Sequence, residues 1–370
     1  MDRPVDVIVC GHLCLDLLPQ MEHIRLNDLP SPGRLFEVGS LAVSTGGAVS
    51  NTGLALHRLG VNVRLMSNVG DDLIGRAIRA FLESRDPALG QSIRIKNDQA
   101  SSYTIVLSPE RADRIFLHCT GTNAAFASVD VDYDLVGQAK IFHLGYPPLL
   151  PSLIADDGVD LERLFRLAHE AGAVTSLDTT LPDSGGVTGQ ADWSKILART
   201  LPYVDIFVPS IKEIIFMLRR ADYERWQSDL MTHIGVSYLD DLADQLFALG
   251  VSALTGFKLG EYGIYLCGSK SVALDDLPIV AAEWLNRRVW HPAFAVKVAG
   301  TTGAGDAAYA GLLAALLNGL SVDEAARWAC AVGACCVEAP DATSGVRTWA
   351  ATSQRLNVGW KLLPQHLNGF

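Results

Sequence analysis

A glycine-rich turn late in this 370-residue chain restricts its fold more than any other feature. The turn reads Thr-Thr-Gly-Ala-Gly-Asp-Ala-Ala over residues 301–308. The apolar stretch Phe294–Val298 before it predicts a strand, and the Ala- and Leu-rich run Ala307–Asn318, which ends at Gly319, predicts a buried helix. Such a turn lets free backbone N–H groups converge at the positive end of the helix dipole. The segment therefore predicts an anion-binding turn in an α/β protein.

Asp306 is the member of this turn that requires a chemical explanation. A carboxylate beside a phosphate cradle repels the ligand, and proton abstraction during phosphoryl transfer would account for its presence. Two alternatives are an ordinary first-turn Asp that favours the helix dipole and a dinucleotide-binding fingerprint formed by Gly303, Gly305 and Ala308. The fingerprint is disfavoured, because too few residues follow Asp306 to complete a dinucleotide-binding sheet.

Strand-like and helix-like runs alternate along most of the chain, which predicts an α/β fold with a mainly parallel central sheet flanked by helices. We expect a single domain over residues 1–370. The predicted strands are Val5–Cys10, Val61–Ser67, Lys140–Leu144, Val174–Asp178, Ile206–Val208, Val251–Gly256 and Gly263–Cys267. The predicted helices before the turn are Ala48–Leu59, Asp72–Leu82, Leu161–Ala171, Ile211–Leu218 and Leu239–Leu249.

Two stretches, Arg34–Val43 and Ser102–His118, alternate apolar and polar residues as half-exposed strands do. We expect strands within about residues 12–45 and 100–120 to form a small β-sheet lid. The lid would cover a site at the C-terminal ends of the central strands, where open α/β sheets bind ligands. A pair of surface hairpins is the alternative.

Composition restricts the classes of partner. Hydrophobic residues make up 49% and charged residues 19% of the chain, which supports a large core. A net charge of −11 disfavours nonspecific binding to nucleic acid or an anionic membrane. No signal peptide or membrane-spanning run is predicted, and the seven scattered cysteines are interpreted as buried free thiols. We therefore expect a cytoplasmic protein.

Several motifs then occur in one order along residues 5–350, and this order resembles the ribokinase-like (PfkB-type) sugar and nucleoside kinases. The motifs are Gly11–Asp16, Gly46–Gly60, Val69–Gly75, Gly121–Ala124, Lys258–Gly263 and Thr302–Asp306 with Gly311. The resemblance implies a ribokinase-like fold, ATP as phosphoryl donor and Mg²⁺ at the phosphates. Neither a Walker A motif nor a protein-kinase motif set is present.

The resemblance and the chemistry assign the same catalytic group. An alcohol is a poor nucleophile at neutral pH, so a base must take its proton, and we expect Asp306 to be that base. The turn amides would stabilise charge on the transferring phosphoryl group as an anion hole. They belong to Gly303, Ala304, Gly305 and Asp306.

On the acceptor side, Asp16 and Asn51 are expected to bind substrate hydroxyls, while Gly46 and Gly47 allow close backbone approach. Asp16 could instead be a turn residue and Asn51 a helix cap. Tyr146 either lines the acceptor pocket or packs in the core. No acidic residue of the kind that ribose-specific relatives use occurs around it, so ribose is disfavoured.

On the donor side, Lys258 and Gly260 are expected near the nucleotide phosphates, with Gly263 shaping the turn and Thr302 in the same cofactor-binding set. Lys258 could instead be a solvated surface lysine. Glu213 is the candidate for binding the magnesium-associated water, although Ser210 replaces the Asn of the family motif.

Gly300 stands where the family commonly has Asp, so the resemblance does not carry over a monovalent-cation site.

The sequence thus predicts an ATP-dependent phosphotransferase acting on a hydroxyl of a small sugar or sugar acid. A nucleoside kinase is the alternative within the same chemistry, and a noncatalytic sugar- or nucleotide-binding protein is the alternative from another class. We also expect a homodimer that forms through the lid strands.

Overall fold

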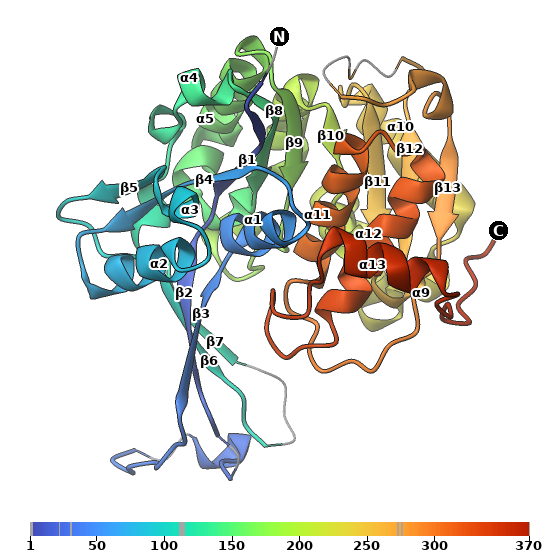
Figure 1. The fold of residues 1–370 in the computed structure, drawn as a ribbon. Coiled ribbons are helices and arrows are strands. Elements are labelled where there is room, and N and C mark those ends of the chain that lie inside the picture. The colour runs from blue at the N-terminus through green and yellow to red at the C-terminus, as the bar shows by residue number, and fades with distance from the viewer. Residues whose placement is uncertain are drawn as a thin grey trace.

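The computed structural model describes residues 3–369 except 22, 30–31, 111–114, 272–273 and 275–276. Its centre is a nine-stranded sheet in the order β13-β12-β11-β10-β9-β8-β1-β4-β5 (Figure 1). Neighbouring strands from β5 to β11 pair in parallel, and β12 and β13 are antiparallel additions. The strands are β1 (Val5–Gly11), β4 (Val63–Gly70), β5 (Ile93–Lys96), β8 (Ala139–Gly145), β9 (Val174–Asp178), β10 (Ile206–Phe207), β11 (Leu254–Lys258), β12 (Ile264–Gly268) and β13 (Arg288–His291).

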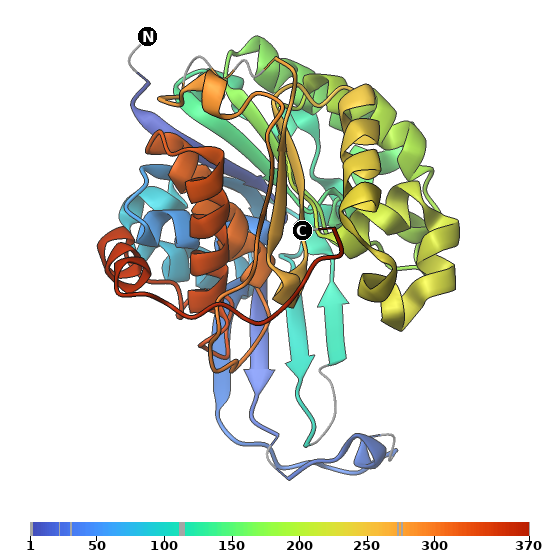
Figure 2. The ribbon, with the colours of Figure 1, turned by 90° about the vertical axis from the view of Figure 1, so that its right-hand side faces the viewer.

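Helices cover both faces of this sheet (Figure 2). Alternate residues of β1 enter different cores, because Val7 and Val9 pack on one side and Ile8 and Cys10 on the other. The first core includes residues of α1 (Ala48–Arg58), α2 (Leu73–Glu83), α3 (Pro87–Gly90), α11 (Ala304–Leu317), α12 (Val322–Cys336) and α13 (Trp349–Asn357). The second includes residues of α4 (Tyr133–Val136), α5 (Pro151–Glu170), α6 (Trp193–Thr200), α7 (Ile211–Leu218), α9 (Leu230–His233) and α10 (Val236–Ala248), with α8 (Arg220–Trp226) packed against it.

A smaller sheet extends away from the large one (Figures 1 and 2). Its order is β3-β2-β6-β7, with β2 and β6 parallel and the two outer pairs antiparallel. The strands are β2 (Cys14–Pro19), β3 (Leu41–Gly46), β6 (Tyr103–Leu107) and β7 (Ile115–Cys119). The predicted α/β fold with a mainly parallel sheet and a small second sheet is confirmed. Strand β3 begins only at Leu41, and residues 111–114 of the second predicted stretch lie outside the described residues.

One predicted strand is wrong. Phe294–Val298 is not part of the sheet, and only Phe294 makes an isolated bridge, to Leu362. The edge strand β13 ends at His291, and Pro292 has no N–H to continue a ladder. The apolar character that suggested a strand has another cause, because Phe294, Val296 and Val298 line a cavity.

The helices lie closer to their predicted bounds than this strand does. α5 begins ten residues before the predicted Leu161, and residues 155–158 interrupt it with non-helical backbone. None of the helices that the structure describes is both long and apolar enough to cross a membrane.

Candidate active site

The predicted anion-binding turn is the start of α11. Gly303 precedes this helix in the left-handed region, with φ of 75°. A Cβ added to Gly303 would lie 2.5 Å from the Cβ of Ala342, so this position requires glycine on both counts. The left-handed residue turns the chain into the helix and places Asp306 in its first turn.

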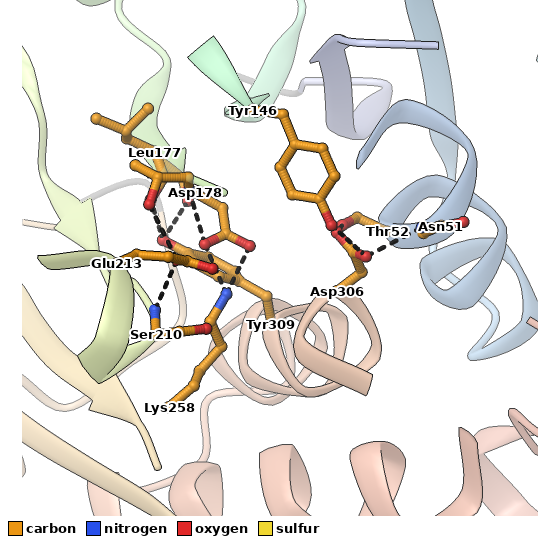
Figure 3. Close-up of polar contacts among 12 residues, drawn as sticks. Asn51, Thr52, Tyr146, Leu177, Asp178, Ser210, Glu213, Lys258, Asp306 and Tyr309 are labelled. Atoms are coloured by element: carbon orange, nitrogen blue, oxygen red, sulfur yellow. Dashed lines mark hydrogen bonds and ion pairs between the residues drawn. The ribbon is translucent and has the colours of Figure 1, made fainter. Parts of the chain in front are cut away.

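The Asp306 side chain is buried and accepts three side-chain hydrogen bonds (Figure 3). Asn51 Nδ2 donates to Oδ2 at 3.0 Å, Thr52 Oγ1 donates to Oδ1 at 3.3 Å, and the Tyr146 hydroxyl donates to Oδ2 at 2.7 Å. Burial raises the pKa of Asp306 above its usual value, although these donors and the Lys258 ammonium act in the lowering direction. The carboxyl is therefore a stronger base than an exposed Asp.

Not all four turn amides are free. The Ala304 N–H donates to the Thr301 carbonyl at 3.3 Å. Within the described chain, the amides of Gly303, Gly305 and Asp306 have no backbone acceptor. These three N–H groups at a helix N-terminus can bind an anion.

Lys258 is not a surface residue. It ends β11, its side chain is 9% exposed, and its Nζ lies 2.6 and 2.7 Å from the two carboxylate oxygens of Asp178, the last residue of β9 (Figure 3). The solvated-lysine alternative is therefore wrong. Both residues end strands of the parallel part of the sheet, so both lie at its carboxyl edge. Open α/β sheets bind their ligands at this edge.

Glu213 lies beside this ion pair at the start of α7. Its Oε2 accepts from the Ser210 N–H at 2.9 Å and from Thr179 Oγ1 at 3.0 Å, so it also caps the helix. Burial raises the pKa of Glu213 and of Asp178, and the Lys258 ammonium opposes both shifts. Burial lowers the pKa of Lys258, but the two carboxyls outweigh burial and raise it, so the ammonium stays charged.

The donor-side residues surround one cavity of about 390 Å³. Its polar end includes Lys258, Gly260, Gly263, Ala304 and Gly305. Its apolar wall is formed by side chains that include Ile264, Phe294, Val296, Val298, Ala329, Cys330, Ala334 and Val337. Thr302 is exposed and does not line this cavity, so the structure separates it from the other predicted donor residues.

The acceptor-side residues also come together. Asp16 lies within β2 and Asn51 in the fourth position of α1, so neither is the turn residue or helix cap of the alternative interpretation. A Cβ added to Gly46 would lie 2.2 Å from Asp16 Oδ2, and one added to Gly47 would lie 2.4 Å from His12 Nδ1. Burial raises the pKa of Asp16 to about 6.

Sequence reasoning did not assign Asp178, Thr52 or Tyr309 to the site. Asp178 ends a predicted buried strand, and this position could have indicated a site residue. Thr52 gives none, because its bond to Asp306 joins positions 254 apart. The Tyr309 hydroxyl donates to the carbonyl of Leu177 at 2.9 Å, and the Lys258 ammonium lies 5.3 Å from its ring. Tyr309 thus holds the end of β9 in place beside Asp178.

The buried ion pair generates a stability prediction. The variant K258M should lower the free energy of unfolding by about 3–5 kcal/mol in urea titrations, because Asp178 would remain buried and unpaired. The double variant K258M/D178N should recover most of this loss. K195M is the control, since Lys195 pairs with Asp157 and Asp192 at the surface, and its unfolding curve should match that of the wild type. A K258M protein as stable as the wild type would contradict the importance of this pair.

Comparison with known proteins identifies relatives of the whole chain. The family model described as pfkB family carbohydrate kinase matches residues 6–349. The chain is 27% identical over 295 residues to an uncharacterized sugar kinase of Archaeoglobus fulgidus, covering 79% of this chain and 98% of that protein. It is 25% identical over 332 residues to a 2-dehydro-3-deoxygluconokinase of Bacillus subtilis, covering 85% of this chain and 87% of that protein.

A solved structure supports the architecture. The structure of Arabidopsis thaliana ribokinase complexed with ribose and ATP has a TM-score of 0.71 and 19% identity, covering 95% of this chain and 98% of that chain. The family match spans nearly all of the sequence, so the predictions of a ribokinase-like fold and of a sugar kinase are confirmed. The chain belongs to the pfkB family of carbohydrate kinases.

Proposed function

We propose that this protein transfers the γ-phosphoryl group of ATP to a hydroxyl of a small sugar or sugar acid, with Asp306 as general base. One observation carries the proposal: Asp306 belongs to both halves of the site. Its neighbours Ala304 and Gly305 line the donor cavity, while its carboxyl is hydrogen bonded to Asn51 and Tyr146 on the acceptor side. Only a group between donor and acceptor can take a proton as the phosphoryl group arrives.

The donor cavity fits a nucleotide. Its apolar wall suits a purine ring, and its polar end offers the Lys258 ammonium and the Gly305 amide to phosphates. Glu213 is an oxygen ligand for Mg²⁺, because the hydrogen bonds of its side chain described above use only Oε2. Both oxygens of Asp178 contact Lys258 and would have to give up that contact to bind the metal. Mg²⁺ usually binds one or two carboxylates together with waters and phosphate oxygens, so this donor set fits it. When bound, Mg²⁺ would neutralise charge on the ATP phosphates.

The protein groups then divide the chemistry. The acceptor hydroxyl donates to the Asp306 carboxyl, which removes the proton as the oxygen attacks the γ-phosphorus. The amides of Gly303, Gly305 and Asp306 stabilise the negative charge on the phosphoryl oxygens. A carboxylate offers about four lone-pair positions, and three are used in this structure.

A nucleoside kinase is the second candidate. The rings of His118 and Tyr146 lie 5.3 and 6.2 Å from the ring of His12, and aromatic rings of this kind can stack on a base. A noncatalytic nucleotide-binding protein could also use the free amides, but it would not need a buried carboxyl beside them, so the site favours an enzyme.

The first prediction concerns the base. D306N should bind Mg-ATP with unchanged affinity and lose about 10²–10⁴-fold in kcat, because Asn cannot accept the proton. A coupled ADP-release assay and a nucleotide-binding titration give the two quantities. D192N, at the exposed N-terminus of α6, is the control and should keep wild-type kcat. Wild-type turnover in D306N would remove Asp306 from its role.

The second prediction concerns pH. Asp16 and Asp306 both act as carboxylates, and burial raises both pKa values, that of Asp16 to about 6. Protonation on acidification should therefore lower kcat/KM for the acceptor below about pH 6, well above the usual Asp range. In D16N, the fall in kcat/KM at acidic pH should follow the protonation of Asp306 alone. A profile flat down to pH 4.5 in the wild type would show that neither carboxyl titrates as proposed.

We also propose a homodimer through the small sheet. Its edge strands expose large apolar side chains, Leu41 and Val43 on β3 and Phe116 and Leu117 on β7, each between 43% and 56% exposed. Light scattering at micromolar concentration should give a dimer mass, and L41E/F116E should give a monomer. V187E, at an exposed apolar residue elsewhere, should leave the mass unchanged. A monomeric wild-type protein would exclude this dimer.

A further inference from the structure

His12 is a buried residue whose ring nitrogens have no hydrogen-bond partner among the described residues. It follows β1 directly and is 3% exposed. Both ring nitrogens, Nδ1 and Nε2, are buried and have no partner within the described residues. Buried polar atoms are nearly always paired, because leaving them unpaired costs their hydration without return. Two unpaired nitrogens on one ring therefore point to a ligand.

The position of His12 places that ligand at the acceptor side. The centre of its ring lies 5.3 Å from that of His118, on the small sheet, and 6.2 Å from that of Tyr146, which follows β8. Tyr146 is the residue that donates to Asp306. Gly47 has no side chain to cover His12 Nδ1, since a Cβ there would lie 2.4 Å away. Asn51 of α1 supplies a third unpartnered buried atom, its Oδ1.

Tyr146 occupies the place that the acceptor needs. Its hydroxyl lies 2.7 Å from Asp306 Oδ2, the distance at which a reacting hydroxyl would donate to the base. Its backbone is in the left-handed region, with φ of 65°, which is uncommon for a residue with a side chain. The phenol is thus a protein hydroxyl in the position of a substrate hydroxyl.

Charge limits what can bind here. Burial lowers the pKa of His12 to about 3, so its ring is neutral and presents one N–H donor and one acceptor nitrogen. A hydroxyl can serve both kinds of atom. Asp16 and Asp306 supply negative charge, and neither forms an ion pair with a described Lys or Arg. Lys258 is held by both oxygens of Asp178. A carboxylate or phosphate on the acceptor would meet like charge without a paired cation.

We propose that His12 binds the acceptor and that the acceptor is an uncharged polyhydroxy compound. One hydroxyl displaces the Tyr146 phenol from Asp306, and others pair with His12 and with Asn51 Oδ1. This inference rests on the proposed phosphotransferase function and narrows it, because it favours neutral sugars or nucleosides over sugar acids and sugar phosphates.

Two substitutions at His12 test the residue. H12L removes both nitrogens, and H12Q keeps one donor and one acceptor. H12L should raise the acceptor KM at least tenfold and leave the ATP KM within twofold, and H12Q should recover most of the loss. A merely structural role would instead lower kcat and thermal stability together without separating the two KM values. An unchanged acceptor KM in H12L would overturn the assignment of His12.

A binding panel tests the substrate class and does not need turnover or a folded His12 variant. Thermal shifts of the wild-type protein with Mg²⁺ and a nonhydrolysable ATP analogue would be measured with fructose, glucose and ribose, with adenosine and inosine, and with gluconate, 2-dehydro-3-deoxygluconate and ribose 1-phosphate. Only the uncharged compounds should raise Tm. The comparison of the sugars with the nucleosides then shows which of these two neutral classes binds. A larger shift with an acid or phosphate, or no shift with any uncharged compound, would overturn the inference.

Different results would contradict the proposed function and the inference about the acceptor. If the wild-type protein phosphorylates a sugar acid and D306N does not, the proposed function is supported and the inference that the acceptor is uncharged is contradicted. If D306N retains turnover with any acceptor, the proposed base falls whatever the panel shows.

Discussion

The carboxyl of Asp306 joins parts of the chain that are far apart in sequence. Its hydrogen bonds reach Asn51, 255 positions earlier, and Tyr146, 160 positions earlier. The left-handed Gly303 fixes the direction in which α11 starts, and α11 carries the carboxyl to the residues of α1 and the end of β8. Because Ala304 and Gly305 line the cavity while the Asp306 carboxyl bonds to Asn51 and Tyr146, the orientation of this glycine turn positions the cavity and the carboxyl relative to each other.

The charges in the site show why ATP binding would depend on local positive groups. Asp178 and Asp306 are buried carboxyls, Glu213 is a partly buried one, and the Lys258 ammonium shifts the pKa of all three. In a chain with a net charge of −11, the overall field does not attract ATP. Local groups must therefore supply the attraction. In the proposed site, the free amides of the α11 turn and the Lys258 ammonium would do so, and a metal held by a carboxyl would reverse the sign of charge next to the phosphates.

The sequence predicted those parts of the fold whose pattern is local. Val174–Asp178 and Ile211–Leu218 match their predicted bounds, because strands buried on both faces are continuous apolar runs and helix ends have their own signals. The prediction of a strand at Phe294–Val298 was wrong because a loop that lines a cavity is as apolar as a buried strand, although it does not join the sheet. Contacts between distant segments, such as that of Lys258 with Asp178, depend on sheet order, which periodicity does not encode. The unpaired nitrogens of His12 likewise become visible only when every neighbour is placed.

The most direct test is a crystal structure with an uncharged acceptor and a nonhydrolysable ATP analogue bound together. We predict an acceptor hydroxyl about 2.6–3.2 Å from an Asp306 oxygen, on the side facing the γ-phosphate, with the Tyr146 phenol displaced. An acceptor whose reactive hydroxyl lies against another residue, with the Tyr146–Asp306 bond intact, would contradict it.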